Sequence, residues 1–348
     1  MVVVGVDAHK RTHTLVAVDS NGQELGSVTV RATSAGHLEA VKWVAQFGEH
    51  RMWALEDCRN MTRRFESELL AAGETVIRVP TKMMAGARKG ARESGKSDPI
   101  DAAAVARAAL REPKLPRAHL DGPAREVKLL VDYREALVRE RTAAQNRLRW
   151  RLHELEPEFD PPPGSLSRYR GLDRTMVMLE RHSGLVADLA SREVARIRAI
   201  TEEANQLERE IRRLVEQVAP SLLQLPGCGS LSAAKLVGET AGVERFRSRD
   251  AFAMWAGAAP IPVWSGHPDR YRLNRGGNRQ VNAALHRIAI TQLRIHPDAQ
   301  AYVQRRIAAG NTKKEALRVL KRRLADVVYR SLLNDAAPPS TIDLKAAA

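Results

Sequence analysis

The sequence of 348 residues is poor in aromatic residues, in cysteine and in long apolar runs. Aromatic residues make up 4% of the chain, which leaves little stacking surface for reading single-stranded bases directly. Two cysteines, Cys58 and Cys228, exclude a disulfide framework and a four-cysteine zinc site, so we interpret both as ordinary buried or half-buried thiols. No apolar run approaches the roughly 20 residues that span a bilayer, so we expect no membrane partner.

The first six residues are apolar but lack a basic segment before them and soon meet Asp7. They are therefore interpreted as a β-strand rather than a signal peptide, and we expect an intracellular, cytoplasmic protein.

Acidic residues are also scarce relative to basic ones. The chain has 56 Lys and Arg against 41 Asp and Glu, a formal charge of +15. Residues 267–330 contain 15 of the basic residues and 4 of the acidic ones, so this segment carries most of the surplus. Such a charge predicts attraction to polyanions, with nucleic acid as the leading partner.

The first third of the chain alternates between strand and helix patterns. Three strand patterns lie between residues 2 and 30, and a helix capped by Ser34 follows to residue 48. Further along we predict a strand at 51–56, a helix at 61–72, a strand at 75–80 and a helix that begins at Asp98. Ser97 is placed as the N-cap of this last helix, and Pro99 in its first turn.

Carboxylates stand at the ends of three of these elements. Asp7 ends the first strand and Glu56 the fourth, and Asp98 and Asp101 lie three residues apart on one face of the last helix. This order resembles the ribonuclease-H fold of Holliday-junction resolvases, in which the first and fourth strands are neighbours. That resemblance implies that the four acids converge around a divalent metal, with Mg²⁺ preferred.

Each acid also has a simpler interpretation. The Asp98 and Asp101 side chains suit a helix N-terminus electrostatically, Asp7 could merely end a strand, and Glu56 could pair with Arg59 or Arg63. Asp57 is a competing choice for the metal ligand. His9 and Lys10 follow Asp7 and are candidates for substrate contact, although an exposed turn requires such residues anyway.

The middle of the chain predicts two long helices. One runs from 123 to 155, and a Pro-rich loop near 161–164 separates it from a second that ends near 218. Apolar residues of the second helix recur at steps of three and four, which is typical of a coiled-coil seam. We expect these helices to pair with each other or with another subunit, and their basic faces could lie on nucleic acid.

Two glycine-containing segments mark the last third. Residues 225–236 resemble a helix-hairpin-helix element, whose tight turn aims backbone N–H groups at a phosphate; a plain corner between helices is the alternative. Ser265 lies in a Ser-Gly turn, and the loop at 274–282 contains Arg275, Asn278 and Arg279 as candidate nucleic-acid contacts.

Taken together, these motifs resemble the DEDD transposases of bacterial insertion sequences, the one-ten family of bridge-RNA-guided recombinases. The segments that carry the resemblance are 5–10, 55–56 and 96–101 in the first part, and 225–229, 256–260, 265–266 and 275–279 in the second. Trp264 and the doubled glycine before Asn278 depart from the usual pattern without removing a reactive group.

The resemblance implies a catalytic set of Asp7, Glu56, Asp98, Asp101 and Ser265, in which the four acids hold Mg²⁺ and the serine attacks a DNA phosphate. It also implies double-stranded donor and target DNA as substrates, a non-coding guide RNA as partner, and a dimer or tetramer whose active site is shared between subunits. Such a protein would associate with the bacterial nucleoid.

The expected architecture is an α/β ribonuclease-H-like domain followed by a helical region and a mainly α-helical domain. We place the resolvase-like domain at 1–115, the helical coiled-coil region at 116–219, the transposase domain at 220–333 and a disordered tail at 334–348. The rival functions are a hydrolytic junction resolvase, a non-catalytic nucleic-acid scaffold, and an actin-like sugar kinase or ATPase. Ala8-His9-Lys10-Arg11 after Asp7 argues against the last, because a small Gly/Thr phosphate loop is expected there.

Overall fold

The computed structural model describes residues 1–56, 61–80, 83, 97–112, 115, 117–118, 122–263, 271–274 and 276–336. The chain forms two compact units, Met1–Asp121 and Gly122–Ala348. The further division expected near residue 219 stays a prediction. Within the described part of the chain, none of the helices has the length and apolar character needed to cross a membrane.

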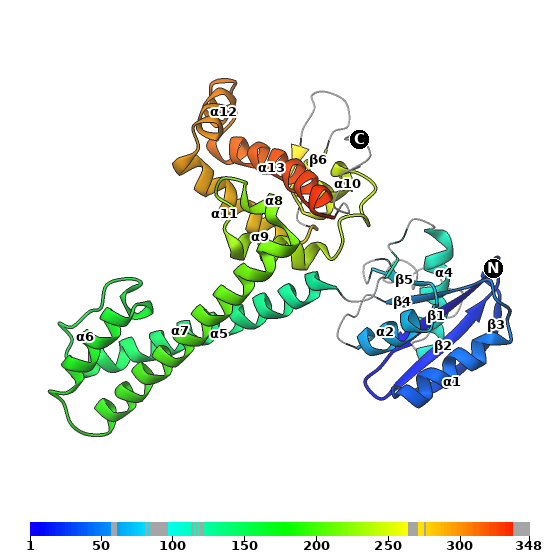
Figure 1. Cartoon of the computed structure of the whole chain (residues 1–348), viewed down its shortest axis with the longest axis horizontal. Coiled ribbons are helices and arrows are strands. Elements are labelled where there is room, and N and C mark those ends of the chain that lie inside the picture. Colours follow the sequence, from blue (N-terminus) through cyan, green and yellow to red (C-terminus); the bar gives the residue numbers. More distant parts are fainter. Residues whose placement is uncertain are drawn as a thin grey trace, which may run out of the picture. The chain divides into compact units, whose positions relative to one another are not determined.

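The first unit is built on one mixed sheet (Figure 1). Its strands are β1 (Val2–Ala8), β2 (Thr12–Val18), β3 (Glu24–Arg31), β4 (Arg51–Glu56) and β5 (Val76–Val79), arranged in the order β3-β2-β1-β4-β5. Strands β1, β2 and β3 are antiparallel neighbours, whereas β1, β4 and β5 run parallel. The prediction that the first and fourth strands are neighbours is confirmed.

Helices cover both faces of this sheet, which explains why its central strands are apolar along most of their length. Helix α4 (Asp98–Arg111) packs on one face through its alanines, and α1 (Ser34–Ala45) and α2 (Arg63–Ala71) pack on the other. Gly5 allows α4 to approach closely, because a Cβ there would lie 1.9 Å from the Ala102 carbonyl oxygen. The N-cap of α1 is Thr33, whose hydroxyl accepts a hydrogen bond from the Gly36 N–H, rather than the predicted Ser34.

The second unit is mainly helical. It begins with α5 (Pro123–Leu155), whose bounds are those predicted, and continues through a 3₁₀ turn (Ser165–Ser167), α6 (Tyr169–Leu179) and α7 (Leu185–Val218). The remaining elements are α8 (Pro220–Leu223), α9 (Ser230–Thr240), α10 (Arg249–Trp255), β6 (Ile261–Pro262), β7 (Tyr271–Arg272), α11 (Arg279–Ile295), α12 (Pro297–Ala308) and α13 (Lys313–Ala336).

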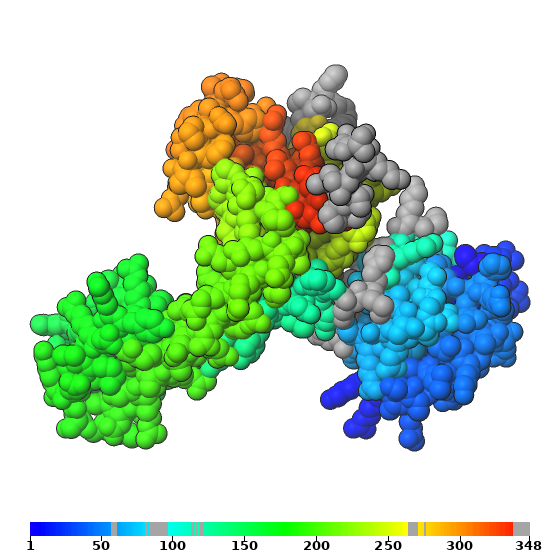
Figure 2. All heavy atoms as spheres, in the orientation of Figure 1, coloured from blue at the N-terminus to red at the C-terminus, as the bar shows by residue number. Residues whose placement is uncertain are grey.

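Helices α5 and α7 pack against each other in antiparallel orientation. Arg134 near the start of α5 bonds Glu208 late in α7, and Arg147 late in α5 bonds Glu193 early in α7. Helix α6 closes the far end of this pair, away from the group α8 to α13, as Figures 1 and 2 show. The apolar stripe of α7 therefore has its partner within the same chain, and a coiled coil in the strict sense stays a prediction.

Two details refine the expected organisation. Helix α13 continues to Ala336, and residues 337–348, the rest of the expected tail, lie outside the described residues. Cys228 is buried, and burial raises the pKa of its thiol to about 12, as expected for an unreactive structural cysteine. Cys58 lies outside the described residues.

Candidate active site

Two acidic residues lie at corresponding positions near the carboxyl ends of two neighbouring parallel strands in the first sheet. Parallel pairing sets Val6 of β1 opposite Leu55 of β4, so the next residues along the two strands are Asp7 and Glu56. The Asp7 side chain is 14% exposed. The parallel register therefore explains why acids separated by about fifty positions in sequence converge.

The first turn of α4 supplies two more carboxylates. Asp98 and Asp101 are three residues apart, so both project from one side of the helix start, where the helix dipole favours negative charge. Asp101 is buried, whereas the side chain of Asp98 is 54% exposed. Ser97 occupies the predicted N-cap position, but its side chain makes no capping hydrogen bond.

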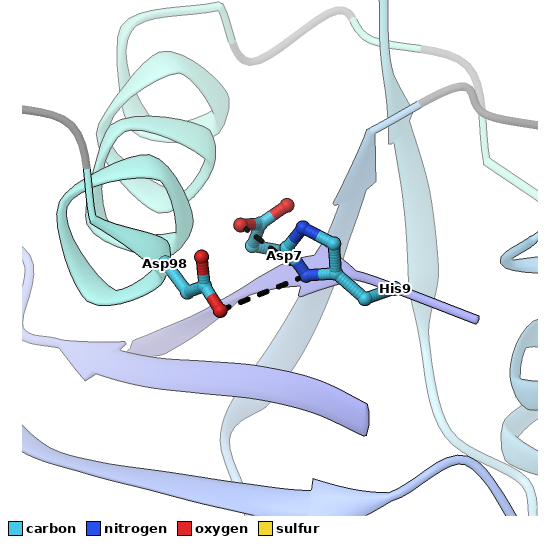
Figure 3. A group of neighbouring side chains, drawn as sticks. All are labelled: Asp7, His9 and Asp98. Atoms are coloured by element: carbon cyan, nitrogen blue, oxygen red, sulfur yellow. Dashed lines mark ion pairs between the residues drawn. The ribbon is translucent and has the colours of Figure 1, made fainter. Parts of the chain in front are cut away.

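His9 joins the two elements at this point. Its Nδ1 atom lies 3.9 Å from Oδ2 of Asp7 and 3.8 Å from Oδ2 of Asp98. Figure 3 shows the imidazole facing both carboxylates, one from β1 and one from α4. One ligand atom from each of these three residues lies within 4.8 Å of the others. Among the described residues, this group is therefore a candidate metal centre.

The charges at this centre act on Asp7. Burial raises the pKa of the Asp7 carboxyl, the nearby His9 lowers it, and the carboxylates of Asp101, Asp98 and Glu56 raise it further. Asp101 and Glu56 lie outside the group of three, but they are close enough for their charges to be felt there. The four predicted acids thus form one electrostatic cluster.

The donor set fits a divalent cation. Carboxylate oxygens are the ligands that Mg²⁺ and other hard cations prefer, and imidazole nitrogen is also accepted by transition metals. A bound cation would offset the mutual repulsion that raises the pKa of Asp7. Asp7, His9 and Asp98 are the residues whose ligand atoms lie close enough together to hold it, and ligation by Glu56 and Asp101 stays a prediction.

The remaining predicted site residues have different outcomes. Ser265, Arg275 and the competing ligand Asp57 lie outside the described residues. Lys10 is exposed in the turn between β1 and β2, where a substrate contact is sterically open. Arg279 begins α11 and is exposed, so its contact with nucleic acid stays a prediction.

Asn278 differs from the other predicted nucleic-acid contacts. Its side-chain oxygen accepts hydrogen bonds from the backbone of Gln280 and Val281, and its amide donates to Glu239. Most of its hydrogen-bonding capacity is therefore already used inside the protein.

The proximity of His9 to the acids was not anticipated, since the sequence suggested only a substrate contact. The available signal was spacing, because residues two apart in a strand project from the same face, and His9 follows Asp7 by two. That alternation persists just beyond the end of β1.

Comparison with known proteins identifies relatives over nearly the whole chain. A protein-family model described as "Transposase" matches residues 4–157, and a second, described as "Transposase IS116/IS110/IS902 family", matches residues 219–304. The uncharacterized 44.8 kDa protein of insertion element IS116 from Streptomyces clavuligerus is 29% identical, with 97% of each chain covered. The uncharacterized 42 kDa protein of IS900 from Mycobacterium paratuberculosis is 26% identical, with 96% of each covered.

A solved structure of T. thermophilus RuvC in complex with a Holliday junction substrate is also similar. The match covers 34% of this chain and 99% of that one, at 15% identity and a TM-score of 0.27. The two family models together account for well over half of the residues and fall on both compact units. On the evidence of the two family models and the insertion-element relatives, the chain belongs to the IS110/IS116/IS902 family of insertion-element transposases.

Proposed function

We propose that this transposase is a site-specific DNA recombinase that cuts and rejoins donor and target DNA with Ser265 as nucleophile and a Mg²⁺-binding acidic cleft. The observation that carries the cleft is the convergence of Asp7, Asp98 and His9 from β1 and α4, with Glu56 and Asp101 close enough to raise the pKa of Asp7. The strand order β3-β2-β1-β4-β5 supports a ribonuclease-H-like assignment for this unit.

A divalent metal bound by these acids would supply positive charge at the scissile phosphate and lower the cost of deprotonating a nucleophilic hydroxyl. The protein's own contribution is to hold the carboxylates in place. Asp7 and Glu56 are fixed by paired strands, and Asp98 and Asp101 by a helix packed on the sheet. His9, between Asp7 and Asp98, can orient both carboxylates or donate to a phosphate oxygen.

The Ser265 hydroxyl would attack a DNA phosphate in a transesterification. The Ser265 Oγ–P bond forms while the bond between phosphorus and the leaving deoxyribose oxygen breaks. The hydroxyl proton leaves the serine, and the departing oxygen gains one. The number of phosphoester bonds is unchanged, so the strand stays activated for rejoining without an energy source.

Recognition of the DNA sequence is assigned to a bridge RNA that pairs with donor and target. In this arrangement the basic surfaces grip nucleic-acid backbones, which agrees with a charge of +15 and 4% aromatic residues. The protein would act as a dimer or tetramer in which one subunit's acids serve another's serine.

The decisive experiment traps the protein on DNA. Wild-type protein, Ser265→Ala and Asp101→Ala are incubated with its RNA, labelled donor and target DNA and Mg²⁺, and denatured gels are examined for a covalent adduct. We expect the adduct with wild type only, and retained DNA or RNA binding in both variants. Cleavage by Ser265→Ala at the wild-type rate without an adduct would exclude the serine mechanism.

A hydrolytic resolvase-like nuclease is the second candidate, because all four acids lie within the first unit and could position water without Ser265. In that case Asp101→Ala abolishes cleavage and Ser265→Ala does not.

Sequencing of RNA that co-purifies with the protein tests RNA guidance separately. A discrete RNA species encoded by the element supports guidance, and random fragments oppose it.

A further inference from the structure

We propose that Asn282, together with Asn278 and Asn274, clamps the two ends of the segment that contains Ser265, and that these asparagines are positioning residues for the serine. The clamp is formed by residues that the structure describes. Its catalytic consequence rests on the proposed function of Ser265.

The segment in question connects α10 to α11. Strands β6 and β7 pair within it in antiparallel orientation, with Ile261 opposite Arg272 and Pro262 opposite Tyr271. Only two residue pairs form this ladder, and a two-stranded ribbon of that length is not stable by itself. Contacts at the two ends, where the segment joins the helical core, therefore add restraint that this short ladder lacks.

Asn282 holds the end that leaves α10. From the first turn of α11, its amide nitrogen donates to the carbonyl oxygen of Ala256 at 3.0 Å and to that of Gly257 at 2.9 Å. Its side-chain oxygen accepts a hydrogen bond from the ammonium group of Lys321 on α13. The Lys321 ammonium group can only donate, so it holds the side-chain oxygen of Asn282 toward α13. The amide nitrogen of Asn282 is therefore directed at the two carbonyl oxygens.

Asn278 holds the end that enters α11. Its backbone N–H donates to the Trp255 carbonyl oxygen at 2.7 Å, and its side-chain amide donates to Oε2 of Glu239 at 2.7 Å. Glu239 is buried on α9 and also accepts from Lys128 of α5. A charged pair from two other helices, Lys128 and Glu239, therefore supports the second end.

The two ends also meet directly. A Cβ on Gly277 would lie 2.2 Å from the Gly257 nitrogen, so the backbones are in contact at this point. Asn274 adds a hydrogen bond from its amide to the Met254 carbonyl oxygen at 2.9 Å. The chain enters and leaves the segment through one tightly packed neck, formed by residues 254–257, 274 and 276–278.

This arrangement explains the local sequence better than nucleic-acid contact alone. Glycine at 277 is required by the close approach, and asparagine at 278 and 282 provides both a donor and an acceptor on a short side chain. A neck of this kind restricts the positions that β6 and β7 can adopt relative to the helical core. It therefore reduces the conformational entropy lost when Ser265 is aligned with a phosphate.

The test compares Asn282→Asp and Asn274→Ala with a control, Asn334→Ala, an exposed position near the end of α13. Asn282→Asp keeps the shape and the acceptor for Lys321 but removes both donated hydrogen bonds. Asn274→Ala is a milder change near the surface, chosen to retain the fold. Full-length proteins are compared by hydrogen exchange, by DNA binding, and by the single-turnover rate of adduct formation well below the melting temperature.

We expect both clamp variants to exchange faster within residues 257–277 while α5 and α7 keep wild-type protection. Adduct formation should fall by about 100-fold in Asn282→Asp, the size of effect that a misplacement of about 1 Å produces. DNA binding should be unchanged, and the control should match wild type. A merely structural role would lower the melting temperature without this loss of rate in the folded protein.

Unchanged exchange within 257–277 in both variants would overturn the clamp. Faster exchange with an unchanged adduct rate would overturn the positioning role and leave the clamp as a structural feature. If wild type itself forms no adduct, the proposed serine function fails, and the exchange data alone then decide whether the clamp exists.

Discussion

At the scale of single residues, the acidic cluster carries charge that works against folding when no cation is bound. Burial and the carboxylates of Asp101, Asp98 and Glu56 raise the pKa of Asp7, so the ionised form is disfavoured in the folded protein relative to the unfolded chain. Removing this charge, or binding a cation, should therefore stabilise the first unit.

Asp7→Asn tests this. In the presence of a chelator we expect the variant to melt above wild type, because the unfavourable charge at position 7 is removed. Addition of 10 mM Mg²⁺ should raise the melting temperature of wild type and leave that of the variant nearly unchanged, because only the former keeps the full ligand set. Asp19→Asn, in the turn after β2, is a control that should respond to Mg²⁺ as wild type does. An equal Mg²⁺ response in Asp7→Asn would contradict a metal site at Asp7.

A second residue effect concerns His13, which is buried in β2 and stacks on His37 and Phe65. Burial, the neighbouring His37 and then His9 lower the pKa of His13 to about 4. Because the folded state prefers the neutral ring, the associated stability is fully present above the usual pKa of 6.5 and is lost as the pH falls toward 4.

We expect the free energy of unfolding to decrease on acidification from pH 6.5 to 4.5, with a contribution from His13 on the order of 2 kcal/mol. His13→Leu places an apolar side chain that does not titrate at this position. Its free energy of unfolding should therefore depend less steeply on pH over the same interval. Urea unfolding at several pH values measures both slopes. Identical slopes would show that His13 does not titrate in this way.

At the scale of elements, the position of Asp98 depends on how α4 packs. The helix lies so close to β1 that Gly5 has no room for a side chain, since a Cβ there would also come within 2.7 Å of the Ala106 nitrogen. The many alanines of α4 favour helix formation, and their small side chains also allow the helix to pack closely on the sheet.

Gly5→Ala should therefore destabilise the first unit by about 3 kcal/mol or more, because backbone atoms of α4 must move to admit the methyl group. Gly26→Ala in β3 is the matched control, since a Cβ there would meet only Phe47 and Trp43 at 3.5 Å, an ordinary contact. Chemical denaturation of the two variants gives the comparison. Equal stability would mean that α4 does not rest on β1 as described.

At the scale of the whole molecule, most of the excess positive charge belongs to the second unit, because residues 267–330 are rich in Lys and Arg. A cavity of about 420 Å³ opens there between α5, α9 and α11. Arg139 and Arg287 line it, and neither forms an ion pair within the part of the chain that the structure describes. Their charges remain available to a phosphate.

Double substitution of Arg139 and Arg287 by Glu should weaken nucleic-acid binding and reduce the slope of log K against log salt by about 2, one for each lost phosphate contact. Arg209→Glu, an exposed change on α7, is the control for a general loss of charge. Titrations at several salt concentrations measure the slope. A slope unchanged by the double substitution would remove the cavity from the nucleic-acid surface.

The amino-acid sequence by itself determined the elements of the first unit, the bounds of α5 and the distribution of charge, because these depend on side-chain periodicity and on composition. It also located Asp7, Glu56, Asp98 and Asp101 at the ends of elements, where topology could gather them.

Only the tertiary structure placed His9 between Asp7 and Asp98, matched the stripe of α7 to α5, and joined Asn282 to Ala256 and Lys321. Local rules describe neighbours up to about four residues apart along a helix or opposite one another in a hairpin. The hydrogen bond between Asn278 and Glu239, 39 residues apart in sequence, exists because packed helices bring those groups together.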